Sequence, residues 1–425
     1  MKSPVPSKFY RVTKRLLDIG ILLYLVSCIL IVATGGLYVS VAGIRIRAAH
    51  LDTPLLVLIL LILLRLALSI RIKEFILLLG ALLFAVGIVE ATLRIWDPPI
   101  ARPRLVQIHK ASPLLDWELV PGASGTGRLG EWYRINHAGM RDDKDYPLDK
   151  KASGFRIAVV GDSFTFGSGV ELEATFPKQM EKLLLLKKIP AEVLNFGVIG
   201  YNMWQYNVVL EKKALPYHPD LVVLCLFQDD LGASNPPYHD PSEWRGTNPF
   251  EEQESSGIIA HFALGNLLRK ANALFEYQYR YRRGQSYVKD IEARKRWWGP
   301  ANPTDMNYRI MSGKAGEKTY SAFEKAFARF VKGATEAGAA VLTVMIPDAV
   351  QLHDPAMQTV NRIVERMCAS LGVPFLDVTP MLEADGDPAS LYLFPIDAHN
   401  SPKGLRIIAQ AIVDQLFASK LVNPP

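Results

Sequence analysis

The feature of this chain that most constrains its fold is a buried-strand pattern at residues 156–161 (Arg-Ile-Ala-Val-Val-Gly), which stops at Gly161 and is followed by Asp162 and Ser163. A run of β-branched and apolar residues that ends in glycine suits the central strand of a parallel sheet. Ligands of such sheets bind beyond the carboxyl ends of the strands, so Ser163 lies where chemistry is expected. A serine hydroxyl is a poor nucleophile alone and needs a base, an orienting carboxylate and oxyanion donors.

A segment near the other end of the sequence contains a candidate base and its carboxylate. Asp397 and His399 precede a periodic apolar stretch at residues 405–416, which predicts a C-terminal helix. Ser401 is a good N-cap and Pro402 a good first helical residue. Both candidates therefore lie on the loop that enters this helix, where the carboxylate can hold the imidazole while its other nitrogen faces a hydroxyl. The alternative is that His399 only caps or packs the helix entry.

With these blocks the chain resembles the SGNH, or GDSL-type, serine hydrolases. Residues 161–163 (Gly-Asp-Ser) match the first block of that family, and residues 397–399 (Asp-Ala-His) match the last. The resemblance implies that Ser163 is the nucleophile, His399 the general base and Asp397 the carboxylate that orients it. It also implies a three-layer, flavodoxin-like α/β domain.

Three further segments carry the resemblance. Residues 195–201 (Asn-Phe-Gly-Val-Ile-Gly-Tyr) resemble the second block, in which the backbone N–H of Gly200 would join that of Ser163 in the oxyanion hole. Residues 219–230 resemble the strand that leads to the third block. Residues 136–142 (Asn-His-Ala-Gly-Met-Arg-Asp) resemble the lead-in of a bacterial subset with membrane-anchored N-termini.

One position departs from the family pattern. The third block ends in Gly-X-Asn-Asp, and its Asn amide donates to the oxyanion, but here that position is Asp229. An ionised carboxylate cannot donate and would repel the developing charge. Three interpretations stay open: a protonated Asp229 donates, the adjacent amide of Gln228 replaces it, or the domain is not catalytic.

The first hundred residues have a different composition. Three apolar stretches, at about 17–43, 54–70 and 75–93, are separated by short connections. Each approaches the roughly 20 residues needed to cross hydrocarbon, so we predict three transmembrane helices. Arg65 lies close enough to the end of the second stretch to reach the membrane interface. The alternative of buried core helices fits poorly because a polar face is nearly absent, and a cleaved signal peptide fits poorly because the first stretch is too long.

Basic residues predict the orientation of these helices. Five of them precede the first stretch, which places the N-terminus in the cytoplasm: Lys2, Lys8, Arg11, Lys14 and Arg15. With three spans, residues 45–52 and the whole domain after residue 96 lie outside the cytoplasm. The expected location is the bacterial inner (plasma) membrane, with lipids as partners of the N-terminal helices.

The domain organisation follows from this division. We predict a membrane region at residues 1–95, a linker rich in Pro and Arg at 96–113, and a hydrolase-like domain at 114–425 with an insertion at about 232–317. Alternating strands and helices imply parallel crossovers. After short strands and turns at 114–150, the expected order is a strand, turn and helix at 156–187, strands at 191–196, 220–227, 339–346 and 374–377, and helices near 203–214, 318–337 and 355–371.

Composition excludes several other classes. A net charge of +6 over 425 residues is mild and does not indicate nucleic acid binding. The three cysteines, Cys28, Cys225 and Cys368, are far apart and predict no disulfide framework. The eight histidines form no metal-binding spacing, so we predict neither a metal nor a cofactor.

The insertion contains aromatic and basic runs at residues 277–283 and 294–298. They could bind acidic glycans or anionic lipids, pack on the domain as a plain solvated helix, or form a lid that selects the substrate.

The function predicted from the sequence is a membrane-anchored ester hydrolase that acts on acylated glycans or lipids of the cell envelope. Two alternatives stay open: an O-acyltransferase that uses the same Ser163–His399–Asp397 triad, and a catalytically impaired binding or assembly subunit. The sequence identifies no protein partner.

Overall fold

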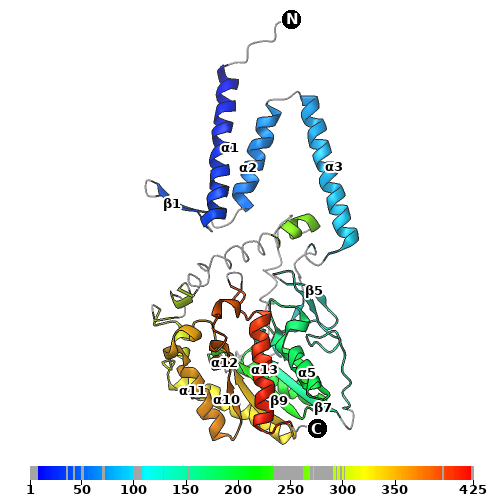
Figure 1. Ribbon diagram of the computed structural model, residues 1–425, viewed down its shortest axis with the longest axis vertical. Coiled ribbons are helices and arrows are strands. Elements are labelled where there is room, and N and C mark those ends of the chain that lie inside the picture. Colours follow the sequence, from blue (N-terminus) through cyan, green and yellow to red (C-terminus); the bar gives the residue numbers. More distant parts are fainter. Residues whose placement is uncertain are drawn as a thin grey trace. The chain divides into compact units, whose positions relative to one another are not determined.

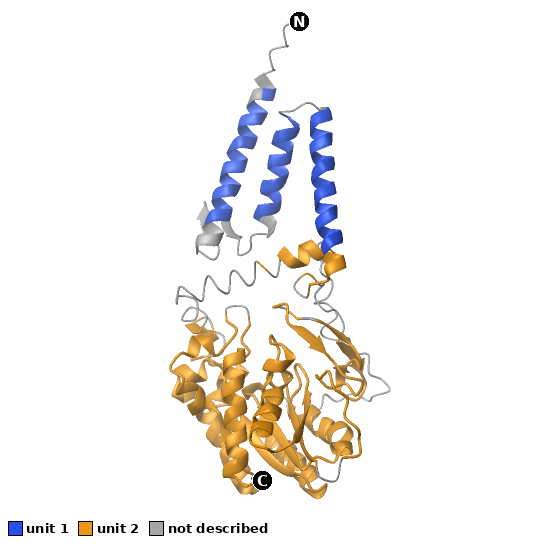
Figure 2. Cartoon of the chain, turned by 45° about the vertical axis from the view of Figure 1, so that its right-hand side comes forward, with its two compact units in different colours: residues 1–92 blue, residues 93–425 orange. Residues whose placement is uncertain are grey.

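The computed structural model divides the chain into two compact units, residues 1–92 and residues 93–425, coloured separately in Figure 2. The structure describes residues 8–34, 37–41, 44–48, 52–68, 72–98, 101, 108–127, 129–150, 154–232, 262–268, 271, 291–292, 294–296, 299–300, 302–394 and 397–422.

Helices dominate the first unit. Its described elements, continuing to residue 96, are α1 (Lys8–Thr34), β1 (Leu37–Val41), β2 (Ile44–Ala48), α2 (Asp52–Ala67) and α3 (Ile72–Trp96). The prediction that the first apolar stretch is helical to residue 43 is wrong, because β1 and β2 pair as antiparallel strands instead. Two consecutive glycines at 35–36 follow Thr34, and glycine is a poor helix former.

The predicted count of three spans is not supported. Among the described residues, one helix is long and apolar enough to cross a membrane, Lys73–Trp96, and α2 is apolar over the shorter range Pro54–Ala67. Many large apolar side chains of α3 are exposed, including Leu77 and Phe84. On α2, Arg65 donates to Asp18 of α1 at 2.7 Å, so this cation has an ionic partner within its own unit.

A five-stranded parallel sheet forms the centre of the second unit. The strands follow the order β11-β10-β9-β7-β8 across the sheet, which is the flavodoxin-like order. All five lie within one residue of the predicted ranges: β7 (Phe155–Gly161), β8 (Ala191–Gly197), β9 (Leu221–Leu226), β10 (Ala340–Met345) and β11 (Phe375–Asp377). The predicted α/β fold is confirmed.

Helices cover both faces of the sheet and make three layers. One face packs against α6 (Met203–Val209), α10 (Glu317–Glu336) and α11 (Thr359–Ser370). The other packs against α5 (Phe176–Leu186), α12 (Thr379–Glu383) and α13 (Pro402–Ala418), and Figure 1 shows α5 and α13 side by side. Ser401 is the N-cap of α13 and Pro402 its first residue, as predicted.

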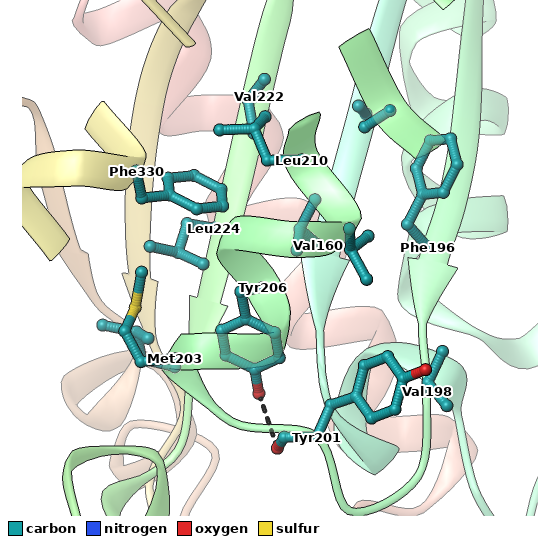
Figure 3. Close-up of a cluster of buried hydrophobic side chains, with 14 of the residues drawn as sticks. Val160, Phe196, Val198, Tyr201, Met203, Tyr206, Leu210, Val222, Leu224 and Phe330 are labelled. Atoms are coloured by element: carbon teal, nitrogen blue, oxygen red, sulfur yellow. Dashed lines mark hydrogen bonds between the residues drawn. The ribbon is translucent and has the colours of Figure 1, made fainter. Parts of the chain in front are cut away.

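The hydroxyl group of Tyr206 is buried in the apolar core on the α6 face of the sheet. Figure 3 shows Tyr206 of α6 among side chains from β7, β8, β9 and α10, with its hydroxyl 3.1 Å from the carbonyl oxygen of Tyr201. The same hydroxyl lies 2.7 Å from Oδ1 of Asp230. Tyr206 therefore connects the core to the loop after β9.

Two short antiparallel hairpins precede β7, as the predicted short strands do, but the first strand lies within residues 96–113, which were predicted as a linker. They are β3 (His109–Ser112) with β4 (Asp116–Leu119), and β5 (Ser124–Thr126) with β6 (Trp132–Arg134). Most of the predicted insertion, including the run at 277–283, lies outside the described residues, as do residues 99–100 and 102–107 of the predicted linker.

Candidate active site

The serine turn follows directly from the end of β7. Ser163 begins α4 (Ser163–Phe166), a single helical turn, and Asp162 caps it by accepting from the N–H of Phe164 at 2.9 Å. The position before the cap must be small, because a Cβ on Gly161 would lie 2.2 Å from Oγ1 of Thr165 and 3.0 Å from the carbonyl oxygen of Cys225. The sequence thus ends the strand and begins the helical turn at the serine within two residues.

The histidine loop is fixed by backbone hydrogen bonds on both sides. The carbonyl oxygen of His399 accepts from the N–H of Leu393 at 2.9 Å, and the N–H of Ser401 donates to the carbonyl oxygen of Leu391 at 2.8 Å. Asp397 accepts from the backbone N–H of His399 at 3.0 Å through Oδ1. The loop therefore sets the direction of the imidazole before any contact with Ser163.

The structure brings Ser163, His399 and Asp397 together. Nε2 of His399 lies 2.7 Å from Oγ of Ser163, and Nδ1 contacts Oδ1 of Asp397. Burial alone would lower the pKa of His399, but the hydrogen bond and charge of Asp397 raise it above its usual value, and the charge of Asp162 adds to this. The imidazole is thus placed and tuned to accept the serine proton.

A stacked pair of aromatic rings lies next to the imidazole, and one ring of the pair contacts it. Phe164 lies beside His399 with ring centroids 4.7 Å apart, and it stacks on Phe227 at 4.2 Å. These contacts limit rotation of the imidazole and place apolar surface next to the nucleophile. Neither ring is among the site residues predicted from the sequence, although each is adjacent to one of them.

Backbone donors for an oxyanion are present at two turns. In the part of the chain that the structure describes, no hydrogen bond uses the N–H of Ser163 or that of Gly200. Gly200 has φ of 78°, a conformation that favours glycine, and a Cβ there would lie 3.2 Å from the ring of Trp117. Trp117 also donates from Nε1 to the carbonyl oxygen of Ile199 at 2.9 Å, which holds the Gly200 turn.

The two candidates for the third donor differ in exposure. Both residues lie on the 3-10 turn Gln228–Leu231, but Gln228 is 0% exposed and its amide atoms have no partner among the described residues. Asp229 is exposed to solvent. Desolvation by the surrounding protein and the charge of Asp348 raise the pKa of Asp229 to about 6. Of the two side chains, only that of Asp229 is open to an entering ligand.

Three carboxyl groups crowd together behind the serine. Oxygens of Asp162, Asp229 and Asp230 lie within 4.8 Å of one another, the spacing of a cation site. Burial and the charge of Asp229 raise the pKa of Asp162 to about 7, and burial and the charge of Asp162 raise that of Asp230 well above its usual value. The oxygens of Asp162 and Asp230 already accept backbone N–H groups.

Asp230 is the member of this cluster best placed to carry a proton. The hydroxyl of Tyr206 has one hydrogen but lies within hydrogen-bond distance of two oxygens, on Tyr201 and on Asp230. Protonated Asp230 resolves this, because it donates to Tyr206 while Tyr206 donates to Tyr201. A proton shared between Tyr206 and Asp230 thus accounts for these two contacts.

One residue of the predicted insertion reaches the site. Arg294 forms a two-pronged ion pair with Asp348 on the loop after β10, with Nε 3.1 Å from Oδ1, and its guanidinium lies 5.5 Å from the centroid of Phe394. Its charge opposes protonation of His399. Of the run at 294–298, residues 294–296 are described, and Arg294 packs on the domain there.

Three solved structures are similar to this chain at low sequence identity. The solved structure of TesA is 14% identical, covering 63% of this chain and 99% of that one, with a TM-score of 0.38. A catalytic mutant of Axe2, an acetylxylan esterase from Geobacillus stearothermophilus, is 13% identical over 63% and 96%, with a TM-score of 0.37. A putative lipolytic protein of the G-D-S-L family from Desulfitobacterium hafniense DCB-2 is 12% identical over 61% and 99%, with a TM-score of 0.35. A search of curated proteins gave no match.

The family assignment rests on a sequence match. The sequence model of the GDSL-like Lipase/Acylhydrolase family matches residues 159–407, which include the serine turn, the Gly200 turn, Asp229 and the histidine loop. The resemblance inferred from the sequence blocks is confirmed. The chain belongs to the GDSL-like lipase/acylhydrolase family.

Proposed function

We propose that this protein is a membrane-anchored serine ester hydrolase that acts on acyl esters of cell-envelope or exported glycans or lipids. The observation that carries the proposal is the contact of 2.7 Å between Nε2 of His399 and Oγ of Ser163, with Asp397 on the opposite imidazole nitrogen. This is the relative geometry that a serine, a base and an orienting carboxylate need for acyl transfer.

The proposed reaction has two halves. His399 takes the proton of Ser163 as Oγ attacks the acyl carbonyl, and then gives it to the departing alcohol as the ester bond breaks. Water, activated by the same imidazole, attacks the acyl-enzyme and releases the acid and the free serine. Asp397 holds the imidazole in the required tautomer throughout. An acyltransferase shares every step before the acyl-enzyme and differs only in the acceptor.

The proposed oxyanion hole combines two backbone amides and one side chain. The N–H groups of Ser163 and Gly200 are the first two donors, and a protonated Asp229 is the third. Donors fixed before reaction stabilise the charge that develops on the carbonyl oxygen. The rings of Phe164 and Phe227 offer apolar contact to the acyl chain.

Covalent labelling tests the proposal. A fluorophosphonate probe should label the purified protein stoichiometrically, because Ser163 Oγ attacks phosphorus as it would an acyl carbon. Ser163→Ala should not be labelled, and Ser168→Ala, a matched change of a buried serine in the next turn, should be labelled like the wild type. Folded wild-type protein that resists the probe would contradict the proposal.

We further propose that the first unit anchors the protein in the plasma membrane, with the N-terminus cytoplasmic and the catalytic domain outside. The apolar helix Lys73–Trp96 and the exposed apolar side chains of the first unit support anchoring. The basic residues before α1 support the orientation.

Thiol accessibility tests this topology. Cysteine introduced as Ala48→Cys in the first unit and as Glu336→Cys on the exposed end of α10 should both react with a membrane-impermeant maleimide in intact cells. The native cysteines Cys28, Cys225 and Cys368 are buried, so the wild-type protein should give a low background. Reaction at Glu336→Cys alone would leave Lys73–Trp96 as the one span that sets this orientation among the described helices, and no reaction at Glu336→Cys would contradict the orientation.

A further inference from the structure

The helix that carries the nucleophile is too short to hold its own shape. Helix α4 is one turn of four residues, Ser163–Phe166, ended by Gly167 in the left-handed conformation with φ of 82°. A single helical turn fixes several dihedral angles for one or two hydrogen bonds and is unstable in isolation. Its geometry, and with it the position of Ser163, must therefore be set by groups outside the turn.

One external group is the side chain of Arg141, which is 0% exposed. Its Nη1 donates to the carbonyl oxygens of Phe166, at 2.7 Å, and of Gly167, and its Nη2 donates to that of Val170. These carbonyls belong to the last residue of α4, its cap and the segment that follows. The guanidinium also lies over the rings of Tyr133 and Phe166, 4.5 and 4.7 Å from their centroids.

Asn195 and Gly197 hold the opposite side of the same turn. Nδ2 of Asn195 donates to the carbonyl oxygen of Thr165 at 3.0 Å. A Cβ on Gly197 would lie 2.3 Å from the backbone nitrogen of Phe166, so β8 touches the turn directly. Asn195 and Gly197 fall within the range that matches the family, 159–407, whereas Arg141 precedes it. The serine turn is therefore held by residues of the matched range and also by Arg141, which lies in the lead-in outside that range.

We propose that Arg141 is a positioning residue for Ser163: its fork of hydrogen bonds fixes the carboxyl-terminal end of α4, so that the serine hydroxyl stays aligned with His399. Arg141 contacts no reacting atom and acts only through the turn. The proposal deepens the proposed function and rests on it. It assigns Arg141 of the lead-in to the architecture of the active site.

Arg141→Lys is the first test, because lysine keeps the charge but cannot span three carbonyl oxygens with a planar fork. We expect kcat for a p-nitrophenyl ester and the second-order rate of fluorophosphonate labelling to fall about 10- to 100-fold together, since a 1 Å misplacement near the chemistry costs of this order. KM should change little, because the binding surface is untouched.

Arg156→Lys is the matched control. Arg156 is also buried and donates to the carbonyl oxygens of Leu148 and Tyr217, as well as to Glu192, but it lies at the amino end of β7. A strand of seven residues separates it from the serine turn by about 20 Å. The Arg156→Lys variant and the Arg141→Lys variant should both lose thermal stability. Only Arg156→Lys should keep the wild-type kcat and the wild-type labelling rate per folded molecule.

The possible outcomes distinguish a failure of the positioning role of Arg141 from a failure of the proposed hydrolase function. If Arg141→Lys loses stability but keeps wild-type kcat, the positioning role is wrong. If Arg141→Lys does not fold, Tyr133→Phe serves instead, because it keeps the ring beneath the guanidinium and removes the hydroxyl that accepts from the N–H of Gly169 at 2.9 Å and donates to Glu131. A fall in kcat without a change in KM would support the proposal, and an unchanged kcat would overturn it. Folded wild-type protein that does not label would instead refute the proposed function, and this proposal with it.

Discussion

Replacing His399 with alanine is expected to lower turnover of an acyl ester by about 10⁴–10⁶-fold. The reason is that Nε2 of His399 is the group within 2.7 Å of Oγ of Ser163 that can take its proton. The measurement is kcat for a p-nitrophenyl ester, with the folded state checked by circular dichroism. Binding of the substrate should persist, because the backbone donors remain.

Asp397→Asn tests the carboxylate that orients His399. The amide keeps the shape of the side chain but favours the wrong imidazole tautomer, so we expect a loss of about 10⁴-fold. It should also lower the pKa of His399, because the hydrogen bond and charge of Asp397 are what raise it. The limb of the pH profile that reports the free base should move to lower pH. A profile that does not move would show that Asp397 does not act on His399.

Asp229→Asn is expected to raise turnover at neutral pH and to extend activity to higher pH. The pKa of Asp229 is about 6, so the carboxyl group donates below that pH and is ionised above it. At pH 7 about one molecule in ten, and at pH 8 about one in a hundred, then has the third oxyanion donor. The asparagine amide donates at every pH, so the variant should exceed the wild type by about tenfold at pH 7 and more at pH 8, within the 10²–10³-fold attributed to such a donor.

Gln228→Ala is the control for this prediction. The Gln228 amide is buried, so its removal should leave the pH profile in place and affect mainly stability. Dependence of kcat on Gln228, with Asp229→Asn neutral, would assign the third donor to the neighbouring amide. If neither change alters kcat, the site depends on the backbone amides of Ser163 and Gly200 alone.

The sheet could be predicted from sequence because parallel strands covered on both faces are continuous apolar runs. β9 is an example: Leu221–Leu226 is buried throughout, and each residue is apolar. The end of α1 could not be predicted in the same way, since an apolar run of this kind fits either a helix or a strand. Hydropathy alone therefore extended the first helix into the hairpin of β1 and β2.

For the site, the reacting side chains were predictable and their supports were not. Ser163 and His399 lie next to signals that a sequence displays, a strand end and a helix N-cap. Arg141 gives no such signal, because its partners are carbonyl oxygens, and every residue has one. Charged residues are expected on the surface, so a buried guanidinium is identified only when the fold places three carbonyl oxygens around it.

The contact between Ser163 and His399 joins residues 236 positions apart. Because of this separation, we expect the serine to become reactive late in folding. The serine turn is held by β7, β8 and the lead-in, whereas the histidine loop follows β9, β10 and β11 in the chain. Contacts so distant along the chain close slowly, because the loop entropy is lost before the contact is gained. A growing or partly folded chain therefore carries an inert serine, and reaction with a fluorophosphonate counts the molecules whose folding is complete.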